Sequence, residues 1–144
     1  MAPEQLFNIS GNLAMAGWLF LIFVSPFWKN INQVVVAIFV TILALFYAWM
    51  ILQSFQFSDL AKFGTLEGVM GLFTNKTMVC AGWIHYLAFD LFIGTWIVRN
   101  AQKHSINHWI TVPSLLLTFM MGPIGLLSYF LIRFALTKTY FAEN

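Results

Sequence analysis

A histidine and an aspartate lie within an apolar stretch that is long enough to cross a lipid bilayer. They are His85 and Asp90, in the segment AGWIHYLAFDLF at residues 81–92. An aspartate near the centre of a membrane helix costs about 2.5–3.5 kcal/mol on insertion scales, so such residues usually face the protein interior and have a function. Carboxylic acids and histidine are the usual proton donors and acceptors of catalysis. The pair therefore indicates proton transfer in a water-poor cavity, with structural hydrogen bonding as the alternative.

Helical geometry places the two residues on different faces of one helix. Asp90 shares a face with Tyr86 and Trp83, which precede it by four and seven residues. His85 lies about 140° away around a helix of 3.6 residues per turn, and it shares its face with Phe89. A helix with polar groups on two sides cannot point either side at lipid. We therefore predict that this helix is central to a bundle and packed on most of its circumference.

The composition is that of an integral membrane protein. Of the 144 residues, 60% are hydrophobic and only 8% are charged, whereas about a quarter of the residues of a soluble domain are charged. The formal net charge of +2 gives no reason to expect nucleic-acid binding. The length favours a single domain over residues 1–144.

Four stretches are apolar and long enough to span a bilayer, which takes about 20 residues. They are roughly Leu6–Trp28, Ile31–Phe55, Thr77–Val98 and Trp109–Thr137. The sequence thus predicts an all-α membrane protein with four transmembrane helices. An even number of spans puts both termini on one side of the membrane. The positions of the Lys and Arg residues weakly favour the cytoplasmic side for them.

The segment between the second and third spans, residues 58–76, is too polar to cross a membrane alone. We predict that it forms a short helix that lies in the interface or re-enters the bundle. Gly64, Gly68 and Gly71 recur at helical spacing and give one smooth face. Such a face suits a neighbouring helix, a ligand or a second copy in a homo-oligomer. Glu67 borders it.

Proline interrupts the fourth span in the sequence GPIG, residues 122–125. Pro123 removes a backbone donor and clashes with the carbonyl four residues earlier, so we predict a kink at Gly122. Antiparallel folding of the third and fourth spans brings this kink level with His85. Asp90 then lies somewhat further across the membrane, and Glu67 lies beyond the near end. This arrangement allows one cavity that contains Glu67, His85 and Asp90.

Other side chains around such a cavity are candidates for substrate binding. These are Asn12, Trp18, Trp83, Tyr86, Phe89, Gly122 and Pro123. No metal or cofactor is expected. The alternative is iron held by Glu67, His85, Asp90 and His108, but the folding estimate separates His85 from His108 by about 20 Å. His104 and His108 have the spacing of two metal ligands on a helix, yet they lie in a hydrophilic turn, and we favour solvated histidines there.

Two segments carry a resemblance to a known family. AGWIHYLAFDLFIGTWI at residues 81–97 and LTFMMGPIGLLSYFLIR at residues 117–133 resemble the small four-helix membrane family named for abscisic acid deficiency four. The resemblance extends over most of the chain, including Glu67 with its flanking glycines. A plant plastid member of that family is tied to neoxanthin synthesis. The start of the chain lacks the composition of a plastid transit sequence, so we expect a bacterial-type member in the cytoplasmic membrane.

The resemblance implies an enzyme that acts on a carotenoid or a related isoprenoid lipid. The implied reaction opens the 5,6-epoxide of violaxanthin to an allene with a hydroxyl, without net redox change. Glu67 or Asp90 would donate a proton to the epoxide oxygen, and His85 would accept one from the neighbouring chain carbon. Trp and Tyr faces would stabilise the cation formed between these events. Two alternatives stay open: metal-dependent oxidative cleavage of the polyene, and a non-catalytic protein that binds carotenoid or lipid or assists assembly.

Overall fold

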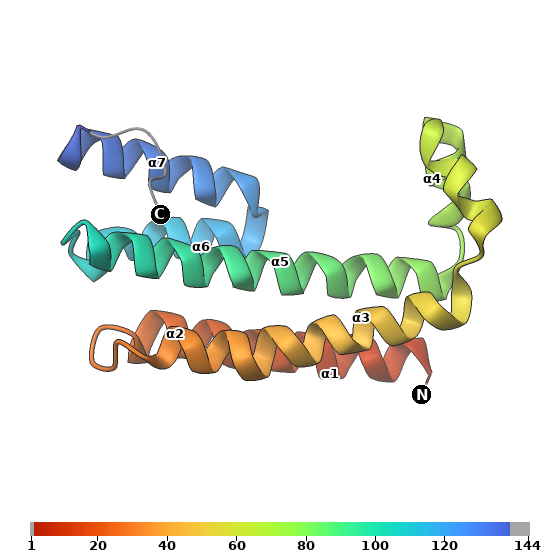
Figure 1. The fold of residues 1–144 in the computed structure, drawn as a ribbon, viewed down its shortest axis with the longest axis horizontal. Helices are drawn as coiled ribbons and strands as arrows, with labels where there is room; N and C mark the ends of the chain where they lie inside the picture. Colours follow the sequence, from red (N-terminus) through yellow and green to blue (C-terminus); the bar gives the residue numbers. More distant parts are fainter. Residues whose placement is uncertain (1, 139–144) are drawn as a thin grey trace.

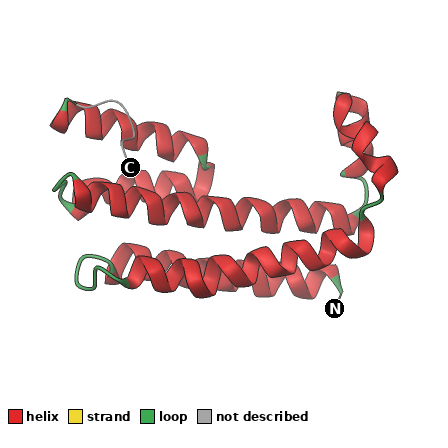
Figure 2. Ribbon diagram, viewed as in Figure 1, coloured by secondary structure: helices red, strands yellow, loops and turns green. Residues whose placement is uncertain are grey.

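Three long helices lie side by side in the computed structural model, which describes residues 2–138 (Figures 1 and 2). Residues 2–138 contain no strand. The three long helices are long and apolar enough to cross a membrane. The first, Pro3–Val24, is composed of α1 (Pro3–Leu19) and η1 (Phe20–Val24). The second, Ile31–Ser54, is composed of α2 (Ile31–Val34), η2 (Val35–Val40) and α3 (Thr41–Ser54). The third is α5 (Lys76–Lys103). Three of the four predicted spans are thereby confirmed as helices of spanning length.

The first two long helices each contain one π-helical segment. In η1 the Ser25 amide donates to the Phe20 carbonyl, five residues earlier, at 3.1 Å. At the end of η2 the Thr41 hydroxyl donates to the Val36 carbonyl at 3.0 Å. A π-helical turn holds one extra residue and widens the helix locally, and such turns are frequent at functional sites.

The third long helix, α5, is the central helix of the bundle, as predicted. It packs against α1, α3, α6 and α7. Small residues allow its closest approach to α1: a Cβ added to Gly94 would lie 2.6 Å from the Trp18 ring, and one added to Gly17 would lie 2.7 Å from Leu91. Backbones of membrane helices come this close mainly at such small residues.

The fourth predicted span is instead a hairpin of two shorter helices, α6 (His108–Met121) and α7 (Pro123–Thr137). At Gly122 the backbone has a φ of 44°, and the chain turns back there rather than kinking (Figure 1). Glycine adopts this φ without steric cost, and Pro123 starts the next helix because a first helical residue needs no amide hydrogen. The prediction of four spanning helices is therefore not confirmed, and the single kinked span is wrong.

Close contacts hold the two arms of the hairpin together. The Ser128 hydroxyl donates to the Ser114 hydroxyl at 2.8 Å. A Cβ added to Gly125 would lie 2.1 Å from the backbone nitrogen of Thr118. The apolar stretch from α6 to α7 is thus long because it forms two packed arms, and not because it crosses the membrane once.

A buried polar cluster fixes α7 beside the last turns of α5. The Tyr129 hydroxyl donates to Asn100 Oδ1 at 2.7 Å, and Arg133 Nη1 donates to the same oxygen at 3.1 Å. The Arg133 guanidinium also lies 5.7 Å from the centre of the Phe130 ring. Because Arg133 and Tyr129 are fully buried, this cluster determines where the second arm ends. The arm returns to the end of the bundle at which α5 finishes.

The segment between α3 and α5 folds as two short helices, η3 (Phe57–Gly64) and α4 (Leu66–Leu72), which project beyond one end of the bundle (Figure 1). Thr65 caps α4 by accepting a hydrogen bond from the Gly68 amide at 3.1 Å. Of the three glycines of the predicted face, only Gly68 is crowded: an added Cβ would lie 2.2 Å from the Lys62 carbonyl oxygen. The absence of a side chain at Gly68 therefore allows α4 to pack closely against η3.

The hairpin changes the expected membrane topology. Helix α1 begins at one end of the bundle and α7 ends at the other (Figure 1), so the argument that puts both termini on one side does not hold.

This topology predicts a labelling pattern for single cysteines introduced into a Cys80→Ser background. In oriented vesicles, an impermeant maleimide should label Lys138→Cys and Gln102→Cys from the same side. It should label Gly64→Cys from the opposite side. All three positions are exposed. Labelling of Lys138→Cys together with Gly64→Cys would instead indicate a fourth crossing.

Candidate functional site

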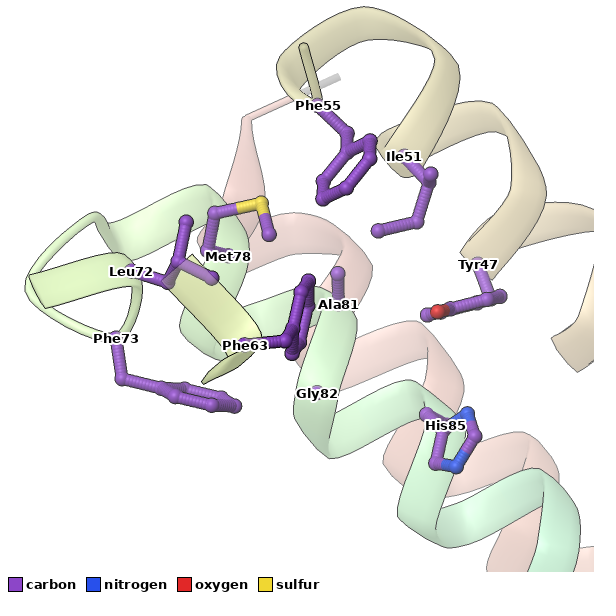
Figure 3. A pocket seen from close by; sticks show the side chains of 10 residues that line it. All are labelled: Tyr47, Ile51, Phe55, Phe63, Leu72, Phe73, Met78, Ala81, Gly82 and His85. Carbon is purple, nitrogen blue, oxygen red and sulfur yellow. The ribbon is translucent and has the colours of Figure 1, made fainter. Parts of the chain in front are cut away.

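A cavity of about 400 Å³ lies between the second long helix, α5 and the η3–α4 segment. This volume is within the usual range of small-molecule sites, about 300–1,000 Å³. We call it the aromatic cavity, and Figure 3 shows the side chains around it. It is lined by Tyr47, Ile51, Phe55, Phe63, Leu72, Phe73, Met78, Ala81, Gly82 and His85. Eight of these ten residues are apolar, so the cavity suits a hydrophobic ligand.

The two polar side chains of the lining lie at one end of the cavity. The rings of Tyr47 and His85 have centroids 5.3 Å apart, and Figure 3 shows them on the side away from Phe55, Leu72 and Phe73. His85 is exposed on the surface of the described chain. In a membrane that surface faces lipid, so a hydrophobic ligand can reach His85 from the side without passing through water.

The geometry of the cavity follows from the pairing of α3 with α5. The two helices run antiparallel and pack extensively, which sets Tyr47 opposite His85 and Ile51 opposite Ala81. A glycine forms part of the floor. A Cβ added to Gly82 would lie 2.7 Å from the Phe73 ring, so the missing side chain lets that ring pack on α5 and form a wall.

Helix η3 covers the cavity through Phe63, whose ring centroid lies 6.1 Å from that of Phe55. Asp59 holds η3 in place. Its Oδ2 accepts a hydrogen bond from the Gln56 amide at 2.9 Å, and its Oδ1 lies 2.7 Å from Lys62 Nζ. The cover therefore depends on an ionised carboxylate.

This dependence predicts that the cover loosens in acid. The Lys62 ammonium and the Gln56 amide lower the pKa of Asp59 below its usual value. A carboxyl with a lowered pKa stabilises the fold above its unfolded pKa, about 4, and this contribution is lost as the pH falls through the lowered value. Hydrogen exchange of residues 57–64, corrected for intrinsic rates, should rise below about pH 4. Asp59→Asn should show the faster exchange at every pH. If the rise below about pH 4 persists in this variant, the Asp59 carboxylate is not the group that holds η3 in place.

The structure does not bring the three predicted catalytic residues into one cavity. His85 lines the aromatic cavity. Glu67 is exposed in the first turn of α4 and does not line it. Asp90 is buried on another face of α5, against the hairpin tip, where a Cβ added to Gly122 would lie 2.8 Å from Asp90 Oδ1. The prediction of a shared cavity below a kink is therefore wrong, because the hairpin tip covers one face of α5 and α3 covers another.

The hairpin tip forms a separate polar spot around Asp90. The Tyr86 hydroxyl donates to the Phe119 carbonyl at 3.3 Å. Within residues 2–138, Asp90 Oδ2 is buried without a hydrogen-bond partner. Gly122 and Pro123 lie in this turn. The predicted substrate residues Tyr86, Gly122 and Pro123 are thus near Asp90 and not near His85.

The remaining predicted substrate residues are dispersed. Trp18 is buried, meets Phe119 edge to face at 5.7 Å, and lines a second, apolar cavity of about 300 Å³ between the first long helix and α6. Trp83 stacks between Phe7 at 5.6 Å and Tyr86 at 5.4 Å. Phe89 is exposed, and the centroid of its ring lies 4.5 Å from that of His85. Asn12 is also exposed and lines neither of these cavities.

The four candidate iron ligands also lie apart. Within residues 2–138, no three His, Cys, Asp or Glu side chains come together as a metal site. His108 donates through Nε2 to the Ile22 carbonyl at 2.8 Å, and its Nδ1 lies 3.4 Å from the Ser25 hydroxyl. It ties α6 to the first long helix, far from Glu67, His85 and Asp90 along the chain.

Sequence reasoning missed several polar residues that line cavities, among them Tyr47 and Asn32. Tyr47 carries a phenol within an otherwise apolar run, ILALFYAWM, and this was the available signal. Its position opposite His85 depends on the register between α3 and α5, which the 58–76 segment sets. That register is not readable from hydrophobicity.

A family model described as ABA DEFICIENT 4-like matches residues 5–129, which include the aromatic cavity, α5 and the hairpin tip. No curated protein and no solved structure matches the chain. The resemblance seen in the sequence is thereby confirmed: the chain belongs to the ABA4-like family.

Proposed function

We propose that the protein is a carotenoid isomerase in which Tyr47 and His85 move protons on a bound epoxide. Its family is carotenoid-related, and its helices are those of a membrane protein. One observation carries the proposal beyond the family. The only two polar side chains of the aromatic cavity have ring centroids 5.3 Å apart at its lipid-facing end.

The cavity walls suit the cyclic end group of a carotenoid. Rings of Phe55, Phe63 and Phe73 and the side chain of Met78 surround the space. The aromatic rings among them offer faces that attract a cation. The opening beside His85 lets the polyene chain continue along the protein surface within the membrane.

The proposed reaction is an isomerisation in which the atoms and electrons balance. The bond between the epoxide oxygen and the ring carbon that carries the polyene breaks, and its electron pair stays on the oxygen. The oxygen takes up a proton and remains on the other ring carbon as a hydroxyl. The neighbouring chain carbon loses a proton, and the electrons of that C–H bond form a new double bond to the ring carbon, which completes the allene.

Two side chains are enough for this proton transfer. The Tyr47 phenol donates a proton to the epoxide oxygen, and the neutral His85 imidazole takes the proton from the chain carbon. The imidazolium then returns its proton to the phenolate, so both groups are restored without a net change. The short separation of the two rings supports this last step.

A second candidate is a protein that binds a carotenoid or another lipid without changing it. One observation favours it: Glu67 and Asp90 lie outside the aromatic cavity, which leaves one predicted ionisable residue inside. In that case the cavity is a binding site, and His85 hydrogen bonds to the ligand.

Expression in cells that accumulate violaxanthin separates the two functions. The isomerase is expected to produce a pigment of unchanged mass with an allene, detected by chromatography and mass spectrometry and absent from cells with an empty vector. Violaxanthin that copurifies unchanged with the folded protein would support the second candidate and overturn the isomerase.

A further inference from the structure

A smaller cavity lies between the same two helices, at their other end. It has a volume of about 270 Å³ and lies between the second long helix and α5. It is lined by Asn32, Gln33, Val36, Ala37, Phe92, Thr95, Trp96 and Arg99. We call it the polar cavity, because five of these eight side chains can form hydrogen bonds.

Asn32 is the residue that marks this cavity as a binding site. Its side chain is 1% exposed, and neither its amide nitrogen nor its amide oxygen has a hydrogen-bond partner among residues 2–138. Buried amides are nearly always paired, so an unpaired one requires an explanation. Asn32 offers one donor group and one acceptor, and a hydroxyl group satisfies both. Arg99 adds a cation at the exposed rim.

The two cavities lie between the same two antiparallel helices, with matching spacings along both. Gln33 precedes Tyr47 by 14 residues, and Arg99 follows His85 by 14 residues on the antiparallel partner helix. At 1.5 Å per helical residue, the polar ends of the cavities are about 21 Å apart. Phe89 lies between them on the face of α5 that carries His85, Phe92 on the same face lines the polar cavity, and both are exposed. The stretch between the cavities is therefore apolar and open to lipid.

The distance along α5 that the two cavities span together matches a long polyene. From Met78, in the aromatic cavity, to Arg99 there are 21 residues of α5, or about 32 Å. This is close to the thickness of the hydrocarbon core of a bilayer, about 30 Å. The π-helical segment η2 contributes Val36 and Ala37 to the polar cavity, and its wider turn leaves room beside Asn32.

We propose that the polar cavity binds the hydroxylated far ring of a polyene whose reacting ring occupies the aromatic cavity. This inference rests on the proposed function and assigns the part of the fold that would hold the far ring of its substrate. A neutral hydroxyl suits Asn32, which is uncharged and lies behind the rim. A phosphate would find one cation, Arg99, among the lining residues.

The test uses the full chain in nanodiscs of phosphatidylcholine and two matched epoxides. Both carry one 5,6-epoxide and a hydroxyl on the reacting ring, and one lacks the hydroxyl on the far ring. We expect the wild type to prefer the dihydroxy substrate by about tenfold in kcat/KM, because the analogue leaves Asn32 unpaired. Asn32→Leu should remove this preference.

Matched variants control for indirect effects. Gln53→Leu changes an exposed amide of the same helix outside both cavities and should keep the tenfold preference. If Asn32→Leu does not fold, Gln33→Leu and Arg99→Met, at the exposed rim, should each reduce the preference at least twofold. Binding of both polyenes is measured in parallel by quenching of tryptophan fluorescence.

The outcomes separate this inference from the isomerase proposal. If the wild type converts both substrates equally and Asn32→Leu changes nothing, the far-ring site is wrong and the isomerase stands. If neither substrate is converted, but the dihydroxy polyene binds tenfold tighter in a way that needs Asn32, the isomerase is wrong and the site stands. Activity that requires added anionic lipid and Arg99, with no far-ring preference, would assign the cavity to a lipid headgroup and overturn the inference.

Discussion

Replacement of His85 by alanine is expected to lower the conversion of the epoxide about 10²–10⁴-fold, the usual contribution of a general base. Binding of the pigment should persist, because the imidazole is one of ten lining groups and the others are mostly apolar. His85→Gln should lose as much activity as His85→Ala. The glutamine side chain can still form hydrogen bonds, but it cannot take up the proton from the chain carbon. The measurement is the rate of allene formation in nanodiscs, with pigment bound per protein as the second readout.

Matched variants separate the proton-transfer role from a structural one. Tyr47→Phe keeps the ring against His85 and removes only the phenol, so its activity should fall while pigment binding remains. His104→Ala alters a histidine of the α5–α6 turn and should behave as the wild type. If His85→Ala and Tyr47→Phe stay active while Asp90→Asn is inactive, the chemistry belongs to the hairpin tip.

The central position of α5 could be predicted from two residues. His85 and Asp90 are far apart around one helix, and a helix with two polar faces needs neighbours on both. The structure supplies α3 beside the first face, where His85 itself stays exposed, and the hairpin tip on the second. Sequence could not predict which neighbour covers which face, since the depth estimate measured position along the helix only. The three candidate residues were for that reason expected in one cavity.

Hydrophobicity alone does not distinguish the α6–α7 hairpin from a single membrane span. The mostly apolar stretch of 29 residues from Trp109 to Thr137 is compatible with one tilted span or with two shorter arms. The small residues around the turn decide between them. Ser114 and Thr118 on the first arm face Ser128 and Gly125 on the second. Their nearly symmetric placement about Met121 and Gly122 is a signal of close antiparallel contact that a search for spanning helices does not use.

The same contact leads to the largest expected effect on stability. Gly125→Ala places a Cβ 2.1 Å from the Thr118 backbone nitrogen and 2.2 Å from its hydroxyl oxygen. The backbone of Thr118 cannot rotate away as a side chain can, so the two arms of the hairpin must move apart. Overpacking typically costs about 1–3 kcal/mol, and a contact with backbone belongs at the upper end. Unfolding by SDS, followed by tryptophan fluorescence, should show a loss of about 3 kcal/mol.

Gly11→Ala is the matched control, because an added Cβ on this helical glycine meets nothing within 4 Å. It should leave stability unchanged or raise it by up to about 1 kcal/mol, since alanine favours helix more than glycine does.

A cross-link then tests whether the loss of stability in Gly125→Ala arises from opening of the hairpin. The Ser114 and Ser128 hydroxyl oxygens are 2.8 Å apart, so Ser114→Cys with Ser128→Cys should form a disulfide readily in a Cys80→Ser background. Adding Gly125→Ala should slow this oxidation, while adding Gly11→Ala should not. Equal rates in both would mean that the two arms are not in the close contact from which the loss of stability is expected.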